Sequence, residues 1–319
     1  MSRIAHFRAR FGRAATDRAW FVVAHATKRL PIARPERHDV ERFEDVPYTR
    51  TALAAHTLDV YRPKNKTGPL PVVVYVHGGG FRILSKDSHW MMGLAFARRG
   101  FVVFNINYRL APAHPFPAAI EDACAALVWA QARARDYGGD PNRVVVAGES
   151  AGGNLVTSLA IAASFPRDEP WARAVFDAGV RIRAALPACG MLQVSDAGRF
   201  ARRKRLSSFV RDRLDEVEHS YLQPSCPANR DLADPLVFLE RGEAAARALP
   251  PFFAGVGTAD PLLDDTRRLK AALDRAGVTC DARYYPGEMH AFHAAMITPN
   301  ARAYWRDAFA FLDRHLPSE

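Results

Sequence analysis

Residues 144–155 read VVVAGESAGGNL, in which three β-branched residues pass directly into a turn of small residues around Ser150. The β-branched run predicts a buried strand, and the residues from 150 to 164, SAGGNLVTSLAIAAS, predict a helix. A side chain at so sharp a turn has a strained backbone, and Gly148 and Gly152 remove the bulk that would clash there. The stretch therefore predicts an exposed serine hydroxyl at the carboxyl end of a strand, facing the N-terminus of a helix.

The rest of the chain repeats this alternation of strands and helices. Buried strands are expected at 70–77, 101–108, 143–149, 180–189, 251–259 and 278–286, and an antiparallel edge at 52–63. Helices are expected at 89–99, 116–138 and 150–164, with a last helix that ends near His315. The alternation indicates an α/β fold, in which a mostly parallel sheet is covered by helices on both faces.

Two segments interrupt the alternation. Residues 1–45 precede the first expected strands and have the pattern of helices. Residues 191–235 are polar and basic, and they form a connection too long for a simple strand–helix crossover. We interpret both segments as a helical cap over the sheet, so that the core of the fold consists of 46–190 and 236–319.

The composition is that of an ordinary globular protein, with 49% hydrophobic and 24% charged residues. The net charge of +10 would suit nucleic acid or an anionic membrane, but no nucleic-acid-binding motif accompanies it. We interpret the densest basic stretch, 199–213, and the arginines near the N-terminus as solvated helix faces. No apolar run reaches the roughly 18 residues that span a bilayer, and no signal-peptide pattern is present. A cytoplasmic location is therefore expected.

The four cysteines, Cys124, Cys189, Cys226 and Cys280, are scattered along the chain, and none forms a CxxC pair. This spacing favours free thiols in a reducing compartment over a disulfide framework. It also lacks the ligand spacing of a zinc site, so no metal is expected.

A second glycine-rich stretch, His77-Gly78-Gly79-Gly80-Phe81, follows a buried strand. Attack on an ester carbonyl produces an oxyanion, which backbone N–H groups in a dry site stabilise. Glycines allow the backbone to approach a substrate closely, and HGGG together with GxSxG is a specific combination. We expect His77 to support this loop by hydrogen bonding rather than to act as a base.

A serine hydroxyl is a weak nucleophile unless a base removes its proton. Two histidines follow the last expected strand: His290 in the loop directly after it, and His293, which we place in the first turn of the last helix. We favour His290 as the base. The acid is expected after the preceding strand, where Asp260 would hold the tautomer of the histidine. Asp264 and Asp265 lie one turn further on, where solvated or dipole-stabilising roles are expected.

Five stretches together resemble the bacterial hormone-sensitive-lipase-like esterases of the α/β-hydrolase fold: HGGGF, YRLAPAHPFPAAIED, DPNRVVVAGESAGGNLV, GTADPLLDD and YPGEMHAF. The resemblance covers residues 70–319. It implies an eight-stranded sheet, an N-terminal and an inserted cap, and hydrolysis of esters with short to medium acyl chains. It also implies that the N–H groups of Gly79, Gly80 and Ala151 bind the oxyanion.

Three positions depart from the usual sequence of this family. Ala291 stands where the family usually has a glycine after the histidine, and residues 82–85, RILS, lack the glycine that usually comes shortly after HGGGF. Glu149 replaces the commoner Asp or Thr. The first two departures affect the shape of the pocket and so the substrate, and none removes a catalytic group.

We therefore predict a serine carboxylesterase in which Ser150 attacks the carbonyl, His290 is the base and Asp260 orients it. This chemistry requires no metal or cofactor, and the expected partner is a small-molecule ester. Nucleic acid and stable membrane insertion are not expected, and the resemblance implies that a homodimer is possible. An amidase or deacetylase of the same fold and a non-catalytic small-molecule receptor are the alternatives, although retention of all three triad residues speaks against the receptor.

Overall fold

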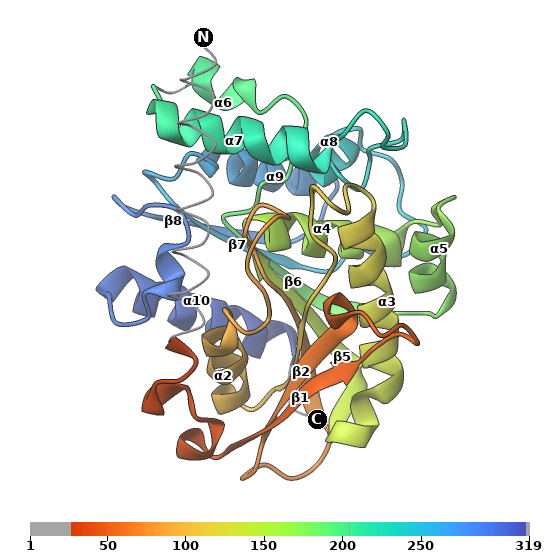
Figure 1. The fold of residues 1–319 in the computed structure, drawn as a ribbon, viewed down its shortest axis with the longest axis vertical. Helices are drawn as coiled ribbons and strands as arrows, with labels where there is room; N and C mark the ends of the chain where they lie inside the picture. Colours follow the sequence, from red (N-terminus) through yellow and green to blue (C-terminus); the bar gives the residue numbers. More distant parts are fainter. Residues whose placement is uncertain (1–26, 204, 317–319) are drawn as a thin grey trace.

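One mostly parallel sheet organises the computed structural model, which describes residues 27–203 and 205–316 (Figure 1). The strands in chain order are β1 Val40–Pro47, β2 Thr57–Pro63, β3 Leu70–Val76, β4 Val102–Ile106, β5 Gly139–Glu149, β6 Ile182–Ala188, β7 Phe252–Gly257 and β8 Cys280–Tyr285. They form an eight-stranded sheet in the order β1-β2-β4-β3-β5-β6-β7-β8. β2 is antiparallel to both of its neighbours, and the other neighbouring strands are parallel.

Helices follow most of the parallel strands. They are α2 Trp90–Arg99, α3 Ala118–Arg133, α4 Ala151–Ser164, α5 Pro170–Asp177, α6 Gly198–Arg203, α7 Ser208–Tyr221, α8 Pro235–Glu240, α9 Leu263–Arg275 and α10 Pro299–His315. Short 3-10 helices occur at Pro31–Ala33, Pro35–His38, Ala54–His56, Ala134–Tyr137 and Phe292–Ala294. In the described part of the chain, no helix is both long enough and apolar enough to cross a membrane.

Side chains of the central strands alternate between two buried clusters on opposite faces of the sheet. In β3, Val72 and Val74 belong to the cluster that includes α3 and α4, whereas Val73 and Tyr75 belong to the cluster that includes α2 and α10. A strand buried on both faces has no polar side, which is why β3 reads as a continuous apolar run. The predicted α/β fold with helices on both faces is confirmed.

The sheet begins earlier than the sequence predicts. The predicted helical segment extends to residue 45, but β1 begins at Val40, which lies opposite Pro63 of β2. β1 is an edge strand, and most of its side chains are partly or fully exposed. Its sequence therefore contains charged residues instead of the continuous apolar run that is typical of a central strand. Residues 1–26 of the predicted cap lie outside the described residues.

The long connection after β6 contains α6 and α7, which lie above the sheet at the top of Figure 1. The basic stretch 199–213 is divided between these two helices rather than forming one. Its first residue, Arg199, is buried, so the prediction of a fully solvated face is wrong at that position. The assignment of 191–235 as a cap stays a prediction.

Candidate active site

Ser150 lies at the junction of β5 and α4 in an unusual backbone conformation, with φ 55° and ψ −116°. Its N–H donates to the carbonyl of Ala188 over 2.9 Å. Its own carbonyl accepts hydrogen bonds from the N–H groups of Asn154 and Met191, both over 3.1 Å. These bonds hold the turn in a conformation that the backbone would otherwise avoid, and such strain often accompanies a functional residue.

The glycines beside Ser150 are required by close backbone contacts. A Cβ atom on Gly148 would lie 2.5 Å from the carbonyl oxygen of Val76, and one on Gly152 would lie 2.0 Å from the same atom. Neither separation is tolerated, so a larger residue would push β5 or α4 away from β3. The steric reason predicted for these two glycines is confirmed.

Asp260 and His290 form a hydrogen-bonded pair at the ends of β7 and β8. Nδ1 of His290 donates to one carboxylate oxygen of Asp260 over 2.9 Å, and the N–H of Leu262 donates to the other over 2.8 Å. Asp260 is buried, whereas 35% of the His290 side chain is exposed. Burial alone lowers the pKa of His290, but the Asp260 carboxylate outweighs it and raises this pKa well above its ordinary value.

The three predicted triad residues follow β5, β7 and β8, but hydrogen bonds do not join all three of them. Among the described residues, no hydrogen bond joins the hydroxyl of Ser150 to His290. Cys189 lies between Ser150 and the Asp260–His290 pair. The residue before it, Ala188, accepts the hydrogen bond from the Ser150 N–H, and its own thiol lies within 4.8 Å of the ligand atoms of Asp260 and His290. Catalytic hydrogen bonds are often long without substrate, so this geometry is compatible with a triad.

His293 is a core residue, and its predicted place in the last helix is wrong. It lies in the 3-10 helix Phe292–Ala294 with 2% of its surface exposed, and burial lowers its pKa to about 4. The last helix begins only at Pro299, where the side chain of Thr298 caps it. A threonine followed by proline is a typical helix start, so the sequence did carry a signal for this boundary.

The loop after β3 requires glycine at two positions, Gly79 and Gly80. Gly79 and Gly80 have φ values of 105° and 61°, which residues other than glycine rarely adopt. A Cβ atom on Gly79 would lie 2.1 Å from the carbonyl oxygen of Ile83. A Cβ atom on Gly80 would lie 2.7 Å from Val217 of α7. The glycines thus allow both the tight turn and the close approach of α7.

A buried charged cluster beneath this loop was not predicted. Glu149 accepts hydrogen bonds from the N–H of Gly78 over 2.5 Å, from Nε2 of His89 over 2.6 Å and from the hydroxyl of Tyr75. Burial alone would raise the pKa of Glu149, but His89 outweighs it and lowers this pKa to about 2. Burial also disfavours the charged form of His89, but the Glu149 carboxylate outweighs burial and raises the pKa of His89. Glu149 and His89 therefore form an ion pair.

This cluster connects the serine turn to the glycine loop, because Glu149 directly precedes Ser150 and binds Gly78. His77 contacts both the glycine loop and His89. Its Nδ1 donates to the carbonyl of Gly78 over 2.7 Å, and its ring stacks on that of His89 with centroids 5.6 Å apart. The predicted supporting role of His77 is consistent with these contacts. Sequence alone could not show the cluster, since its members lie on three separate segments.

Two departures from the family pattern occupy left-handed backbone positions. Ala291, next to His290, has φ 57°, and Leu84, beyond the glycine loop, has φ 75°. Glycine would adopt both conformations at lower cost, which explains why a glycine is usual near these places. Ala291 and Leu84 therefore hold a side chain in a conformation that glycine adopts more easily.

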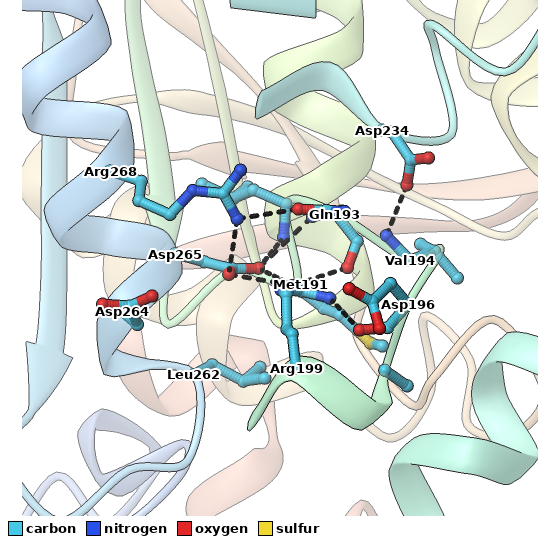
Figure 2. A network of polar contacts seen from close by, with 12 residues as sticks. Met191, Gln193, Val194, Asp196, Arg199, Asp234, Leu262, Asp264, Asp265 and Arg268 are labelled. Carbon is cyan, nitrogen blue, oxygen red and sulfur yellow. Dashed lines mark hydrogen bonds and ion pairs between the residues drawn. The ribbon is translucent and has the colours of Figure 1, made fainter. Parts of the chain in front are cut away.

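A polar network anchors the connection after β6 to α9 (Figure 2). Asp265 is fully buried, and it accepts hydrogen bonds from the N–H of Leu192 over 2.9 Å and from Nη2 of Arg199 over 2.7 Å. Of the two roles expected for Asp265, the solvated one is wrong, because Arg199 of α6 meets it in the interior, whereas its place in the first turn of α9 is compatible with the dipole-stabilising one. Asp264 is partly exposed and pairs with an arginine at the surface. The network joins α6 to the helix that follows Asp260.

Comparisons with known proteins agree with this fold. A family model described as the alpha/beta hydrolase fold matches residues 73–294. The chain is 33% identical to the carboxylesterase NlhH of Mycobacterium tuberculosis over 92% of this chain and 89% of that protein. It is 28% identical to the versiconal hemiacetal acetate esterase of Dothistroma septosporum, over 82% of this chain and 78% of that protein.

A bacterial heroin esterase structure aligns with a TM-score of 0.75 and 25% identity, covering 95% of this chain and 91% of that one. The chain is therefore a carboxylesterase that belongs to the α/β-hydrolase fold family, among its bacterial hormone-sensitive-lipase-like esterases.

Proposed function

We propose that this carboxylesterase hydrolyses esters of short to medium acyl chains through a triad of Ser150, His290 and Asp260. The hydrogen bond of 2.9 Å between His290 and Asp260 carries the proposal. In the neutral imidazole it holds the proton on Nδ1, so that Nε2 is unprotonated and able to act as a base. The strained turn at Ser150 supports the assignment of the nucleophile.

In the proposed reaction, Nε2 of His290 takes the proton from Ser150 as the oxygen attacks the ester carbonyl. The resulting oxyanion accepts hydrogen bonds from the N–H groups of Gly79, Gly80 and Ala151. When the intermediate collapses, His290 gives its proton to the leaving alcohol and an acyl-serine remains. His290 then removes a proton from water, which attacks the acyl group, and the carboxylic acid leaves as Ser150 regains a proton.

The contacts of α7 with the glycine loop support a preference for short acyl groups. The rings of Phe81 and Tyr221 stack with centroids 3.8 Å apart, and Arg82 pairs with Glu216 over 2.8 Å. A helix held this close to the proposed oxyanion site restricts the room for a long chain. We accordingly propose residues 191–235 as a cap segment. Residues 40–45 belong to β1, so an N-terminal cap would have to end before Val40. The name of the relative from Dothistroma septosporum also refers to an acetate ester.

An acyl-chain series of p-nitrophenyl esters, from acetate to palmitate, tests the substrate class. We expect a higher kcat/KM for butyrate than for palmitate, and the opposite order would contradict a restricted pocket.

The nucleophile is tested separately, because Ser150→Ala should reduce kcat by at least about 10⁴-fold. An organophosphate should label Ser150 in the wild type. Ser225→Ala, at an exposed position, is the control and should keep full activity. Comparable activity of Ser150→Ala and the control would show that another residue is the nucleophile.

A further inference from the structure

Three side chains of different metal-binding types meet where β6, β7 and β8 end. Cys189, Asp260 and His290 follow these strands, and one ligand atom from each lies within 4.8 Å of the others. The proposed triad uses the aspartate and the histidine, but it has no use for the thiol. Cys189 is fully buried and, like the other three cysteines, is not in a disulfide. Its place beside the histidine is therefore a feature of this chain that the reaction does not explain.

The spacing of the three groups fits a thiophilic cation. Zinc holds sulfur at about 2.3 Å and nitrogen or oxygen at about 2.0–2.2 Å, so the ligand atoms of a tetrahedral site lie about 3.3–3.8 Å apart. The ligand atoms lie within 4.8 Å of one another, so binding requires each pair to approach by at most about 1–1.5 Å, which side-chain rotation can provide. Thiolate, imidazole and carboxylate together suit Zn²⁺ or Cd²⁺, whereas Mg²⁺ and Ca²⁺ prefer oxygen ligands alone.

Of the three ligands, the histidine is the one that solvent reaches. The Asp260 side chain is fully buried, but 35% of the His290 side chain is exposed. A cation would therefore meet the imidazole first and then the thiol and carboxylate behind it. Three protein ligands leave a fourth position for water, as in zinc sites that are not closed.

We propose that Cys189, Asp260 and His290 form an inhibitory binding site for Zn²⁺ or Cd²⁺. Binding releases the thiol proton to solvent, and the metal replaces the Nδ1 proton that His290 shares with Asp260. The imidazole proton then lies on Nε2, so His290 has no lone pair left to accept the proton of Ser150. The inhibition rests on the proposed function, because it requires His290 to be the base, whereas binding of the metal does not.

Metal binding is tested on the full chain made inactive by Ser150→Ala, so that the readout is independent of catalysis. Cd²⁺ is titrated while the ultraviolet charge-transfer band of a cadmium thiolate is followed. The band should saturate near one equivalent, and it should disappear when Cys189→Ala or Cys189→Ser is added. Alanine and serine are chosen because Cys189 has φ 37°, where a β-branched residue would be strained.

Cys226→Ser in the same background is the matched control, because Cys226 is the least buried of the four cysteines. This control should keep the band. A band that survives the loss of Cys189, or that depends on Cys226, would overturn the site. Circular dichroism of each variant shows whether it is folded, and having two substitutions at Cys189 keeps the test decisive if one of them fails to fold.

Inhibition is tested on the active chain with p-nitrophenyl butyrate and increasing Zn²⁺. Activity should fall and return on addition of EDTA. Cys189→Ser should raise the Zn²⁺ concentration for half inhibition, relative to its own metal-free activity, by more than about tenfold. Cys226→Ser should leave that concentration unchanged.

The two proposals fail in different ways. A cadmium band that depends on Cys189, with no inhibition of the active chain, would overturn the inhibitory role and contradict His290 as the base. No such band, together with an inactive Ser150→Ala variant, would overturn the metal site while the proposed triad stands.

Discussion

Replacing Glu149 with glutamine should slow catalysis more than it weakens substrate binding. Glu149 is 4% exposed, and it accepts hydrogen bonds from Gly78, His89 and Tyr75. Glutamine keeps the size of the side chain but removes its negative charge. The substitution therefore weakens the link between the serine turn and the glycine loop without leaving a cavity.

The loss of stability can be worked out in two ways. A hydrogen bond to a charged group is worth about 1 kcal/mol more than a neutral one, so three such bonds amount to about 3 kcal/mol. The lowering of the Glu149 pKa from 4.5 to about 2 corresponds to a similar free energy, about 3–4 kcal/mol, since each unit is worth about 1.4 kcal/mol. We expect the free energy of unfolding to fall by about 3 kcal/mol.

The loss of activity follows from the position of Gly78 next to the proposed oxyanion donors. Removing one oxyanion donor outright costs about 10²–10³-fold in kcat. Here the donors stay but their loop is held less firmly, so we expect a decrease of about 10- to 100-fold in kcat. Negative charge on the carbonyl oxygen develops mainly in the transition state, so KM should change by less than about threefold.

The assay measures kcat and KM on p-nitrophenyl butyrate and urea unfolding on the same preparation. Asp264→Asn is the control, because it removes a partly exposed carboxylate that pairs at the surface, and its stability should change by less than about 1 kcal/mol. If Glu149→Gln loses stability but keeps kcat within about threefold of the wild type, the cluster does not position the loop. Unchanged stability would refute the buried ion pair itself.

The same variant should change the dependence of stability on pH. The pKa of Glu149 is lowered, so its contribution is present above 4.5 and is lost as the pH falls toward 2. The pKa of His89 is raised, so its contribution is present below 6.5 and is lost as the pH rises through the folded value. The stability difference between wild type and Glu149→Gln should thus be largest between pH 4.5 and 6.5. Urea unfolding across this range checks it, and a difference independent of pH would contradict the ion pair.

Three further substitutions test other parts of the structure. His290→Ala should lower kcat/KM by at least about 10⁴-fold, and His293→Ala by less than about 10²-fold; the reverse order on p-nitrophenyl butyrate would identify His293 as the base. Ala291→Gly should raise the free energy of unfolding by about 1 kcal/mol, because it relieves a left-handed conformation; no gain in urea unfolding would show that the turn is not strained. Asp265→Asn should lower that free energy by about 3–5 kcal/mol, because it leaves Arg199 buried without its partner; a loss below about 1 kcal/mol would show that the network contributes little to stability.

The elements that the sequence predicted well are those whose own residues carry the signal. The central strands are apolar on both faces, so runs such as VVVYV in β3 and RVVVAGE in β5 indicate their place without knowledge of the neighbours. β1 was missed because it lies at the edge of the sheet and reads VERFEDVP, with charged residues where a central strand is apolar. The last helix starts later than predicted, at Pro299 after the Thr298 cap, because the residues around His293 form a separate 3-10 helix first.

By itself, the sequence determined the α/β alternation, the serine turn, the glycine loop and the pairing of Asp260 with His290, because each depends on local spacing and on the order of strands. Only the tertiary structure decided which polar groups are buried together. Glu149 meets His89 and Gly78, Asp265 meets Arg199, and Cys189 lies beside His290. These partners come from separate segments, and nothing in the local pattern of one residue specifies the charge or donor that folding brings against it.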